Sequence, residues 1–498
     1  MDKYVGAATM KMIDAKSINE VGIPSMVLME RAALSVVKNI KEREDNNSRC
    51  IVVAGVGNNG GDGICIARIL NEYGYNVKVY VIGNQEKCSV ETRQQIDIAK
   101  NSGVCFVNQI DFNEYDIVID SIFGIGLCRD IKDDFYEMIE RINKADKVVY
   151  AVDIPSGINT DTGCIQGIAI KADYTITFGV NKKGLILHPG RIYAGKVIVE
   201  DIGFPKHVIK ELCEEDAFIS YSKDSYMDYL PKRIPNSNKG TYGRVLVVAG
   251  SKNMAGACYF SAKAAYRTGA GLVQIFTCED NRVILQELIP EAIMTTYDNS
   301  IEKLNKAIEW STCVVVGPGL GTDSMAKEMV KYIIDNCQKP MVLDADALNI
   351  LADAEEKYIK CLDNVIITPH LKEMSRLVKC DVSEIKQNMY NPRELALRIN
   401  GLLDKENNVL VLKDATSIVL NSKEIYVNTS GNNGLATGGS GDILSGIIAG
   451  LLAQGLNNIE AASLGVYIHG MAAEHYVDKA NCYSLNASDL LDELQYIL

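Results

Sequence analysis

The sequence predicts an α/β protein built on parallel sheets, and three observations carry this prediction. Short runs of β-branched residues alternate with amphipathic stretches, which is the order of strands joined by crossover helices. Glycine-rich turns follow a predicted strand in each half of the chain. The chain has 498 residues, more than one hydrophobic core can organise, so we expect at least two domains.

Two series of strands are predicted, each strand rich in valine and isoleucine. The first series comprises residues 50–54, 77–82, 117–120, 148–153 and 174–178. The second comprises residues 245–249, 272–276, 313–316, 341–344, 365–368, 409–413 and 417–420. A charged, turn-rich stretch from about residue 205 to 241 separates the two series. We therefore place a boundary near residue 225 and expect domains of residues 1–220 and 225–498.

Composition excludes several classes of partner. The net charge is −13 and no long basic stripe is present, which argues against a nucleic-acid surface. The 14 cysteines form no C-x-x-C pair, which favours reduced thiols in a cytoplasmic protein. Charged residues precede any apolar run at the N-terminus, so no secretory signal is predicted. The most apolar stretch, residues 443–456, is too short for a membrane span and predicts a buried helix.

A glycine-rich segment in the second half indicates an anion site. Residues 431–442 read G-N-N-G-L-A-T-G-G-S-G-D and precede an apolar, helix-compatible run. The glycines let backbone N–H groups face one point, and the helix N-terminus adds the positive end of its dipole. Asp442 is therefore interpreted as a group that acts on the reaction partner of a phosphate donor, kept ionised by the helix dipole. An ordinary N-cap is the alternative, although the five glycines in this segment exceed what a cap needs.

A second glycine turn, G-V-G-N-N-G-G-D-G at residues 55–63, follows the first predicted strand. It contains the G-x-G-x-x-G pattern of dinucleotide-binding proteins, but the next strand does not end on the acid that this fingerprint requires. Asp62 would also repel a pyrophosphate. The oxygen atoms of Asn58, Asn59 and Asp62 suit a hard cation, a sugar or an amide instead.

Two more acids close predicted strands in the same half. Asp120 precedes S-I-F-G-I-G-L, and Asp153 precedes I-P-S-G. The carboxyl ends of neighbouring parallel strands form the ligand crevice of an open sheet, so these loops should converge on residues 55–63. The alternative is that each acid only caps its own turn.

These motifs carry a resemblance to known families. Leu28-Met29-Glu30, the 55–63 turn, Asp120 with F-G-x-G-L, and V-D-I-P-S-G resemble the NAD(P)H-hydrate epimerase, or YjeF N-terminal, family. K-G-T-Y-G at 239–243, G-P-G-L-G at 317–321, T-P-H at 368–370 and the closing T-G-G-S-G-D are similar to the ADP-dependent NAD(P)H-hydrate dehydratase family. The resemblance implies a Rossmann-like three-layer parallel-sheet domain followed by a ribokinase-like α/β domain.

The resemblance also implies two reactions. The substrates would be hydrated NADH and NADPH, which exist as R and S epimers. The first half would interconvert the epimers with potassium bound, and the second would dehydrate the S form at the expense of ADP, with magnesium. We also expect a homo-oligomer.

Site residues follow from the matching motifs. In the first half the implied substrate contacts are Asn58, Asn59, Gly60, Gly61, Asp62, Gly124, Ile125, Gly126, Leu127, Cys128, Arg129, Asp130 and Asp153. Potassium would be held by Asn59, Asp120 and Ser156, and Asp153 would exchange a proton with the substrate.

In the second half the implied substrate contacts are Gly321, His370, Leu371, Lys372, Glu373, Met374, Ser375, Arg376 and Asp442. The adenine nucleotide would be held by Lys413, Asp414, Ala415, Thr416, Ser417, Asn432, Asn433, Gly434, Leu435, Ala436, Thr437, Gly438, Gly439, Ser440 and Gly441. Phosphorylation of the ring hydroxyl would create a better leaving group, with Asp442 taking the hydroxyl proton.

The chain departs from the family pattern in places. Family members often read T-P-H-P-G-E, whereas His370 is followed here by L-K-E, so the path of this loop should differ. Ile125 stands where threonine is commoner, and Ala33 where glycine is frequent. No Walker A sequence occurs, which excludes a P-loop mechanism. The rival functions are a ribokinase-like small-molecule kinase fused to a dinucleotide-binding domain, and a non-enzymatic dinucleotide sensor.

Overall fold

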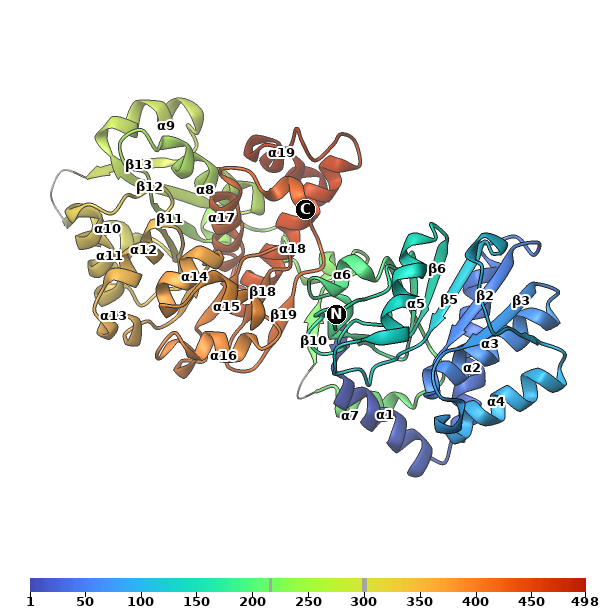
Figure 1. Cartoon of the computed structure of the whole chain (residues 1–498). Coiled ribbons are helices and arrows are strands. Elements are labelled where there is room, and N and C mark those ends of the chain that lie inside the picture. Colours follow the sequence, from blue (N-terminus) through green and yellow to red (C-terminus); the bar gives the residue numbers. More distant parts are fainter. Residues whose placement is uncertain (215–216, 298–301) are drawn as a thin grey trace. The chain divides into compact units, whose positions relative to one another are not determined.

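The computed structural model describes residues 1–214, 217–297 and 302–498 (Figure 1). The chain divides into two compact units, Lys3–Phe218 and Ile219–Leu498, the latter together with Met1–Asp2. The division falls before residue 225 because Ile219 pairs with Tyr426, and Tyr221 and Tyr226 are buried in the core of the second unit.

The first unit is built on a parallel sheet with the strand order β4-β3-β2-β5-β6-β7-β9. All five predicted strands are confirmed, while the short β4 and the edge strand β9 were not predicted. The bounds are β2 Arg49–Ala54, β3 Asn76–Val81, β4 Cys105–Phe106, β5 Ile117–Ser121, β6 Val148–Val152, β7 Tyr174–Phe178 and β9 Lys196–Glu200. The chain runs outward from β2 to β4 and returns at β5, so the ligand crevice of this sheet is expected between β2 and β5.

Helices cover both faces of this sheet. Alternate residues of β2 point to opposite sides: Val52 belongs to a core with α1, α2 and α3, whereas Val53 belongs to a core with α5. This alternation makes the three-layer fold that the sequence predicts. The helices are α1 Ala7–Asn19, α2 Ser25–Lys41, α3 Asn58–Glu72, α4 Val90–Asn101, α5 Asp133–Lys144, α6 Gly190–Tyr193 and α7 Lys206–Leu212, with 3₁₀ turns η1 Gln85–Lys87, η2 Phe112–Glu114 and η3 Lys183–Leu185. A short parallel pair joins β1 (Asp2–Val5) to β8 (Asn181–Lys182).

The second unit holds a mixed sheet with the order β13-β12-β11-β14-β15-β16-β17-β18-β19-β10. The seven predicted strands are present, and the bounds are β10 Phe218–Ser220, β11 Arg244–Val248, β12 Leu272–Cys278, β13 Ile293–Tyr297, β14 Cys313–Val316, β15 Met341–Leu343, β16 Val365–Ile367, β17 Val409–Leu412, β18 Ile418–Leu420 and β19 Ile425–Val427. The expectation of parallel strands is wrong for β18, which runs antiparallel to both of its neighbours, β17 and β19. The turn between β17 and β18 is too short for a crossover helix, so the chain must return as a hairpin.

The helices of this unit include α17, which packs closely on α8 and also contacts α18 and α19. They are α8 Ala255–Thr268, α9 Arg282–Leu288, α10 Glu302–Trp310, α11 Ser324–Asn336, α12 Asp346–Asp353, α13 Glu356–Lys360, α14 Leu371–Val378, α15 Val382–Gln387, α16 Pro392–Leu397, α17 Ser440–Ala453, α18 Asn458–Val477 and α19 Ala487–Ile497. The 3₁₀ turns are η4 Tyr226–Tyr229, η5 Lys239–Tyr242, η6 Glu279–Asn281, η7 Leu402–Asp404 and η8 Asn433–Leu435.

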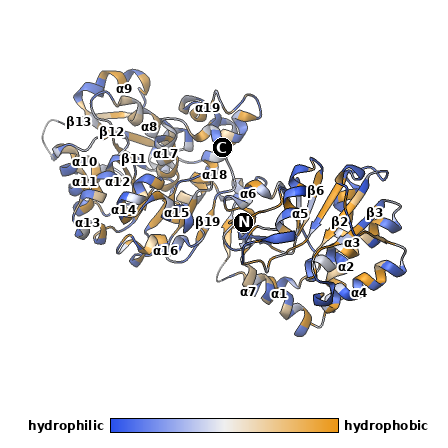
Figure 2. Cartoon of the chain, in the orientation of Figure 1, coloured by the Kyte–Doolittle hydropathy of each residue, from blue (hydrophilic) through white to orange (hydrophobic). Residues whose placement is uncertain are grey.

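Close packing explains a glycine inside α17. A Cβ at Gly446 would lie 2.2 Å from the Ser261 carbonyl oxygen of α8, so only glycine allows this approach. The prediction of a buried helix here is confirmed. Hydrophobic residues dominate the strands and inner helices in Figure 2, while outer helices such as α4 carry both hydrophobic and hydrophilic residues. Within the residues described, no helix combines the length and the apolar character that a membrane crossing needs.

Candidate active sites

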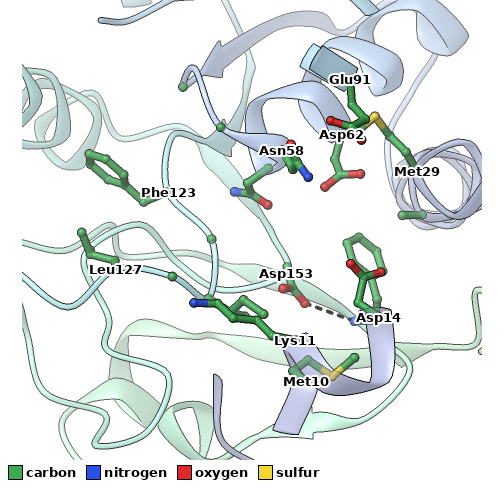
Figure 3. A pocket seen from close by; sticks show the side chains of 18 of the residues that line it. Met10, Lys11, Asp14, Met29, Asn58, Asp62, Glu91, Phe123, Leu127 and Asp153 are labelled. Atoms are coloured by element: carbon green, nitrogen blue, oxygen red, sulfur yellow. Dashed lines mark hydrogen bonds between the residues drawn. The ribbon is translucent and has the colours of Figure 1, made fainter. Parts of the chain in front are cut away.

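The first candidate site is a cavity of about 660 Å³ at the carboxyl ends of the strands of the first unit (Figure 3). Its wall includes most of the predicted substrate residues, namely Asn58, Asn59, Asp62, Gly124, Ile125, Gly126, Leu127, Cys128, Arg129 and Asp153. Gly60, Gly61 and Asp130 are not among its lining residues. A Cβ at Gly60 would lie 1.9 Å from the Gly55 carbonyl oxygen, so this glycine serves the close turn.

Residues that no motif indicated complete the cavity. Met10, Lys11 and Asp14 come from α1, and Lys182 and Phe204 come from the C-terminal part of the unit. They are far apart in the sequence and follow no recognisable spacing. The fold alone brings them to the carboxyl ends of the strands.

Asp153 is fixed by contacts to one of its oxygens. Its Oδ1 accepts hydrogen bonds from Lys182 Nζ at 2.5 Å, the Thr177 hydroxyl at 3.0 Å and the Phe178 amide at 3.4 Å. Its backbone has φ = 66°, an unfavourable value for a residue with a Cβ. Burial lowers the pKa of Lys182 and the Asp153 carboxylate opposes this effect.

Two further acids, Asp62 and Asp14, line the same cavity, and neither forms an ion pair with a described residue. Burial raises the pKa of Asp62 well above its ordinary value, and the charges of Asp153 and Asp14 add to the effect. Burial also raises the pKa of Asp14, with contributions from Asp153 and Glu91. The cavity thus combines one ion-paired carboxylate with acids that favour the protonated form.

The predicted potassium residues are only partly brought together. Ser156 donates to Asp120 twice, from its hydroxyl at 2.6 Å and from its amide at 2.8 Å. Asp120 also accepts a hydrogen bond from the Ile122 amide at 3.2 Å, so it does cap its turn. Asn59 lies against Gly124, where an added Cβ would be 3.2 Å from the Asn59 Cβ. Among the described residues, Asn59 forms no hydrogen bond with Asp120 or Ser156.

The buried carboxylate of Asp120 has no cation beside it among the described residues. The side chain is fully buried, and burial raises its pKa to about 6 although the Ser156 hydrogen bonds oppose the shift. Among the described residues no lysine, arginine or histidine forms an ion pair with it. The buried Nδ2 of Asn59 likewise has no hydrogen-bond partner there. A buried carboxylate of this kind is costly unless a cation or a proton neutralises it.

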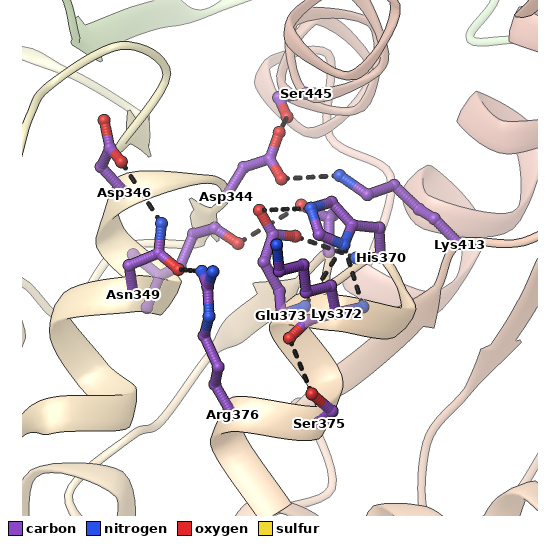
Figure 4. Close-up of polar contacts among 12 residues, drawn as sticks. Asp344, Asp346, Asn349, His370, Lys372, Glu373, Ser375, Arg376, Lys413 and Ser445 are labelled. Atoms are coloured by element: carbon purple, nitrogen blue, oxygen red, sulfur yellow. Dashed lines mark hydrogen bonds and ion pairs between the residues drawn. The ribbon is translucent and has the colours of Figure 1, made fainter. Parts of the chain in front are cut away.

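The second candidate site lies at strand ends in the second unit (Figure 4). Asp344 follows β15, and its carboxylate lies between Lys413 Nζ at 2.8 Å and the Ser445 hydroxyl at 2.7 Å. Burial alone would raise the pKa of Asp344, but the Lys413 ammonium and these hydrogen bonds hold it below its ordinary value. Ala345, the next residue, has φ = 48°, so the backbone turns sharply here.

Asp442 stands in the first turn of α17, as predicted, but its charge state differs from the expectation. Burial raises its pKa to about 7, and the nearby charge of Asp344 contributes while Lys413 opposes. With a pKa of about 7 the carboxyl is about half ionised at neutral pH, so the expectation that Asp442 stays ionised is met only in part. A pKa near neutrality suits a group that exchanges a proton during turnover.

The glycine turn ahead of α17 has the predicted tight geometry. Gly439 has φ = 90°, and a Cβ there would lie 2.8 Å from the Phe260 ring. The Ser440 hydroxyl contacts His469 Nε2 at 3.1 Å, so this side chain faces the protein interior. Only the backbone of Ser440 is therefore offered to an anion.

His370 caps the N-terminus of α14. Its Nδ1 accepts hydrogen bonds from the amides of Lys372 and Glu373, and Glu373 Oε2 accepts one from the His370 amide at 2.9 Å. This reciprocal capping box explains how L-K-E replaces the usual Pro-Gly, because the helix begins directly after His370. Burial raises the pKa of Glu373 to about 7.

A chain of polar contacts connects Gly321 to α14. The Gly321 amide donates to Asp346 Oδ2 at 2.8 Å, Asn349 donates to Asp346 Oδ1 at 3.3 Å, and Arg376 donates to Asn349 at 2.5 Å. The predicted substrate residues Gly321 and Arg376 therefore belong to one network through two residues that were not predicted.

The predicted nucleotide segments occupy two loops. Residues 413–417 form the turn between β17 and β18, and Lys413 and Asp414 share a hollow with His370, Leu371, Lys372 and Ser375. Residues 432–436 surround η8 and are held by Asn432, which accepts from the Gly434 amide at 3.0 Å and donates to the Ala473 carbonyl at 2.9 Å. Glu373 and Met374 are buried and do not line that hollow.

Sequence reasoning missed Asp344, Asp346, Asn349 and Ser445. A signal existed for Asp344, because it ends a predicted strand in the same way as Asp120 and Asp153 do. Nothing in the sequence indicated that Ser445, inside an apolar helix, would bond that carboxylate.

Comparisons with known proteins cover nearly the whole chain. Residues 25–184 match the family described as YjeF-related protein N-terminus, and residues 245–496 match the family described as NAD(P)H-hydrate dehydratase. The bifunctional NAD(P)H-hydrate repair enzyme Nnr of Coxiella burnetii is 35% identical over 483 residues, 96% of each chain. The Escherichia coli K12 protein of the same name is 32% identical over 489 residues, 97% of this chain and 92% of that one.

Solved structures resemble the second unit. A ribokinase-like superfamily protein from Enterococcus faecalis V583 is 28% identical, with a TM-score of 0.50, over 56% of this chain and 95% of that one. An ADP/ATP-dependent NAD(P)H-hydrate dehydratase from Bacillus subtilis, co-crystallised with ATP and Mg²⁺, is 29% identical, with a TM-score of 0.49. The match covers 56% of this chain and 97% of that one. With a YjeF-related domain ahead of a ribokinase-like dehydratase domain, and over 30% identity along its length, the chain belongs to the family of bifunctional NAD(P)H-hydrate repair enzymes.

Proposed function

We propose that this protein repairs hydrated NADH and NADPH by two reactions at two separate sites. The first unit epimerises the R and S forms, and the second dehydrates the S form with an adenine nucleotide. The observation that carries this proposal is that each unit holds its own strand-end aspartate paired with a lysine, Asp153 with Lys182 and Asp344 with Lys413, beside acids of raised pKa. Each set of site residues lies within one unit.

Dehydration is proposed to begin with phosphorylation of the ring hydroxyl by ADP. Asp442 takes the hydroxyl proton, and the backbone N–H groups at the start of α17 stabilise the transferred phosphoryl group. Departure of phosphate, with loss of a proton from the neighbouring ring carbon, then restores the C=C bond of the reduced ring and leaves AMP and phosphate. Magnesium would accompany the nucleotide phosphates and supply charge neutralisation, and the Asp346 carboxylate offers the kind of oxygen ligand that it prefers.

Potassium is proposed to lie at Asn59, Asp120 and Ser156 in the first unit. The donor set fits a hard monovalent cation because it is made of oxygen atoms and because the buried Asp120 carboxylate has no cationic partner among the described residues. Bound potassium would neutralise that charge and draw the Asn59 amide oxygen inward. The loop at Gly124, against which Asn59 packs, would be held in place by the same contacts.

One incubation tests the reaction assignment. Chemically hydrated NADH, separated into its epimers, is mixed with the full-length protein, and NADH absorbance is followed with ADP, with ATP and without nucleotide. We expect absorbance to return from either epimer only with nucleotide, and epimer ratios to equilibrate without it. A phosphorylated product with no recovery of absorbance would indicate a kinase, and binding without either reaction would indicate a sensor.

The division of labour is tested with fragments. Residues 1–218 should interconvert the epimers without nucleotide, and residues 219–498 should dehydrate the S form alone. A folded fragment that lacks its own reaction would show that the two units depend on each other. Light scattering of the full chain checks the expected homo-oligomer.

A further inference from the structure

A fully buried lysine lines the cavity of the first unit and has no place in the reaction proposed so far. Lys182 Nζ lies 2.5 Å from Asp153 Oδ1, 2.7 Å from the Thr177 hydroxyl and 3.0 Å from the Phe178 carbonyl oxygen. An ammonium group has three N–H donors, and these three acceptors use all of them. Lys182 therefore has no donor left for a ligand.

The effect of Lys182 falls on one oxygen of Asp153. The lysine, the Thr177 hydroxyl and the Phe178 amide all contact Oδ1, and no hydrogen bond to Oδ2 is found among the described residues. The carboxylate is thus anchored on one side and presents its second oxygen to the cavity that it lines (Figure 3). An ion pair with a buried ammonium stabilises the charged form of a carboxylate.

Asp62 lies in the same cavity under opposite conditions. It comes from α3, has no ion pair or hydrogen bond from its carboxyl group among the described residues, and burial raises its pKa. The other charged side chains of the cavity are Lys11 and Asp14 from α1, Glu91 from α4, and Arg129 from the loop after β5. Two aspartates with opposed environments in one cavity are the arrangement that assigns one as base and the other as acid.

We propose that Lys182 is a positioning residue that holds Asp153 as the base of the epimerase site, and that Asp62 is the acid that protonates the hydroxyl of the hydrated ring. The inference rests on the proposed epimerase function and assigns its acid and its base.

The chemistry is balanced without any further reagent. In the hydrated ring the hydroxyl sits on the carbon bonded to the ring nitrogen. Asp62 gives its proton to this hydroxyl, the C–O bond breaks, water leaves, and the nitrogen lone pair forms a C=N bond. A water molecule then adds to the opposite face of this cation and gives a proton to Asp153. One proton returns from Asp153 to Asp62 through solvent, and the ring carbon has inverted.

The test uses the full-length protein and purified R or S hydrated NADH, without nucleotide, with epimer ratios followed by chromatography. Lys182→Met should lower kcat of epimerisation about a hundredfold, within the range for loss of general base catalysis, with little change in KM. Its pH profile should differ from that of the wild type, because the ion pair between Lys182 and the Asp153 carboxylate is lost. Asp62→Asn should lower kcat similarly and remove the fall in activity at high pH.

Controls separate positioning from folding. Lys16→Met removes a surface ion pair of α1 with Glu211 and should leave epimerisation unchanged. The double variant Lys182→Met with Asp153→Asn removes both charges, so it should fold and have the activity of Asp153→Asn alone. Dehydration of the S form should be unchanged in every variant.

Contrary results are equally definite. If Lys182→Met keeps the wild-type pH profile and loses activity only in proportion to thermal stability, Lys182 is structural. If Asp62→Asn epimerises at the wild-type rate, Asp62 is not the acid. A wild-type protein that does not epimerise at all would refute the proposed function itself, independently of these variants.

Discussion

The two units build their sites from the same local device. In each, an aspartate at the carboxyl end of a parallel strand is paired with a lysine from a later strand end, at 2.5 Å for Asp153–Lys182 and 2.8 Å for Asp344–Lys413. In each, a second aspartate near the start of a helix that follows a glycine turn, Asp62 or Asp442, has its pKa raised by burial. The two sheets differ in strand order, yet each site combines an aspartate held by a lysine with a second aspartate of raised pKa.

The two lysines differ in the number of N–H donors that are free to bind a ligand. Lys182 is fully buried, and its three N–H groups donate to three acceptors of the protein. The Lys413 side chain is 19% exposed and makes one side-chain hydrogen bond among the described residues. Lys413 also lines a hollow beside His370. The difference teaches that the first lysine can only position its aspartate, while the second can also meet an anionic ligand.

The largest effect is expected from Asp442→Asn. Loss of the base should lower kcat of dehydration by about 10²–10⁴-fold and leave nucleotide affinity nearly unchanged, because the backbone donors of α17 remain. Single-turnover kinetics and nucleotide binding by calorimetry measure the two quantities. Epimerisation in the same sample is the control and should not change. An equal loss of affinity and rate would show that Asp442 is structural.

Sequence reasoning found residues that belong to contiguous motifs and missed those that the fold assembles. Asp153 stands in V-D-I-P-S-G, whereas Lys182, 29 residues later, looks like a surface lysine and reaches Asp153 only because the chain returns past β7. Asp14 lies before the region that matches the YjeF-related family and enters the cavity through α1.

The charge state of Asp442 was predicted only in part, for a related reason. The local sequence shows a helix N-terminus, which favours an anion. It does not show the burial or the proximity of Asp344, which come from a strand almost a hundred residues earlier and dominate the pKa. The strand positions were predictable because valine and isoleucine runs are local, but the direction of β18 depended on the length of the turn before it.

The proposed contrast between the lysines is sharpened by Lys413→Met. We expect KM for the nucleotide to rise about tenfold to a hundredfold, since a charge-assisted hydrogen bond is worth about 1.5–3 kcal/mol. Lys182→Met should instead leave KM for the hydrated dinucleotide almost unchanged. Steady-state kinetics with varied ADP measure the effect. Lys423→Met, which removes an exposed ion pair with Glu406, is the matched control. An unchanged KM in Lys413→Met would remove the contrast.

Potassium should matter to one unit only. Removing monovalent cations by dialysis, or Asp120→Ala, should lower epimerisation roughly tenfold or more, as loss of groups around a metal site commonly does. Dehydration should be unaffected. Asp120→Ala should also lower the thermal stability of the first unit, which calorimetry of residues 1–218 measures. Full epimerisation in buffer free of potassium and sodium would return Asp120 to the role of a turn cap.

The smallest expected effect is a pH dependence of dehydration that follows from the pKa of Asp442. Its pKa is raised to about 7 by burial. A base must be ionised to accept the hydroxyl proton, so kcat of dehydration should rise as pH rises through about 7 and become level above it. Below that pH, kcat should fall by up to about tenfold for each pH unit. Measurement at saturating nucleotide and substrate removes the titration of the phosphates from the profile. Asp442→Asn is the control, because its residual rate should lose this dependence while the epimerase profile of the same molecules persists. A wild-type kcat that is flat between pH 6 and 8 would mean that the bound Asp442 is already ionised, and that nucleotide binding supplies the stabilisation that the helix dipole alone does not.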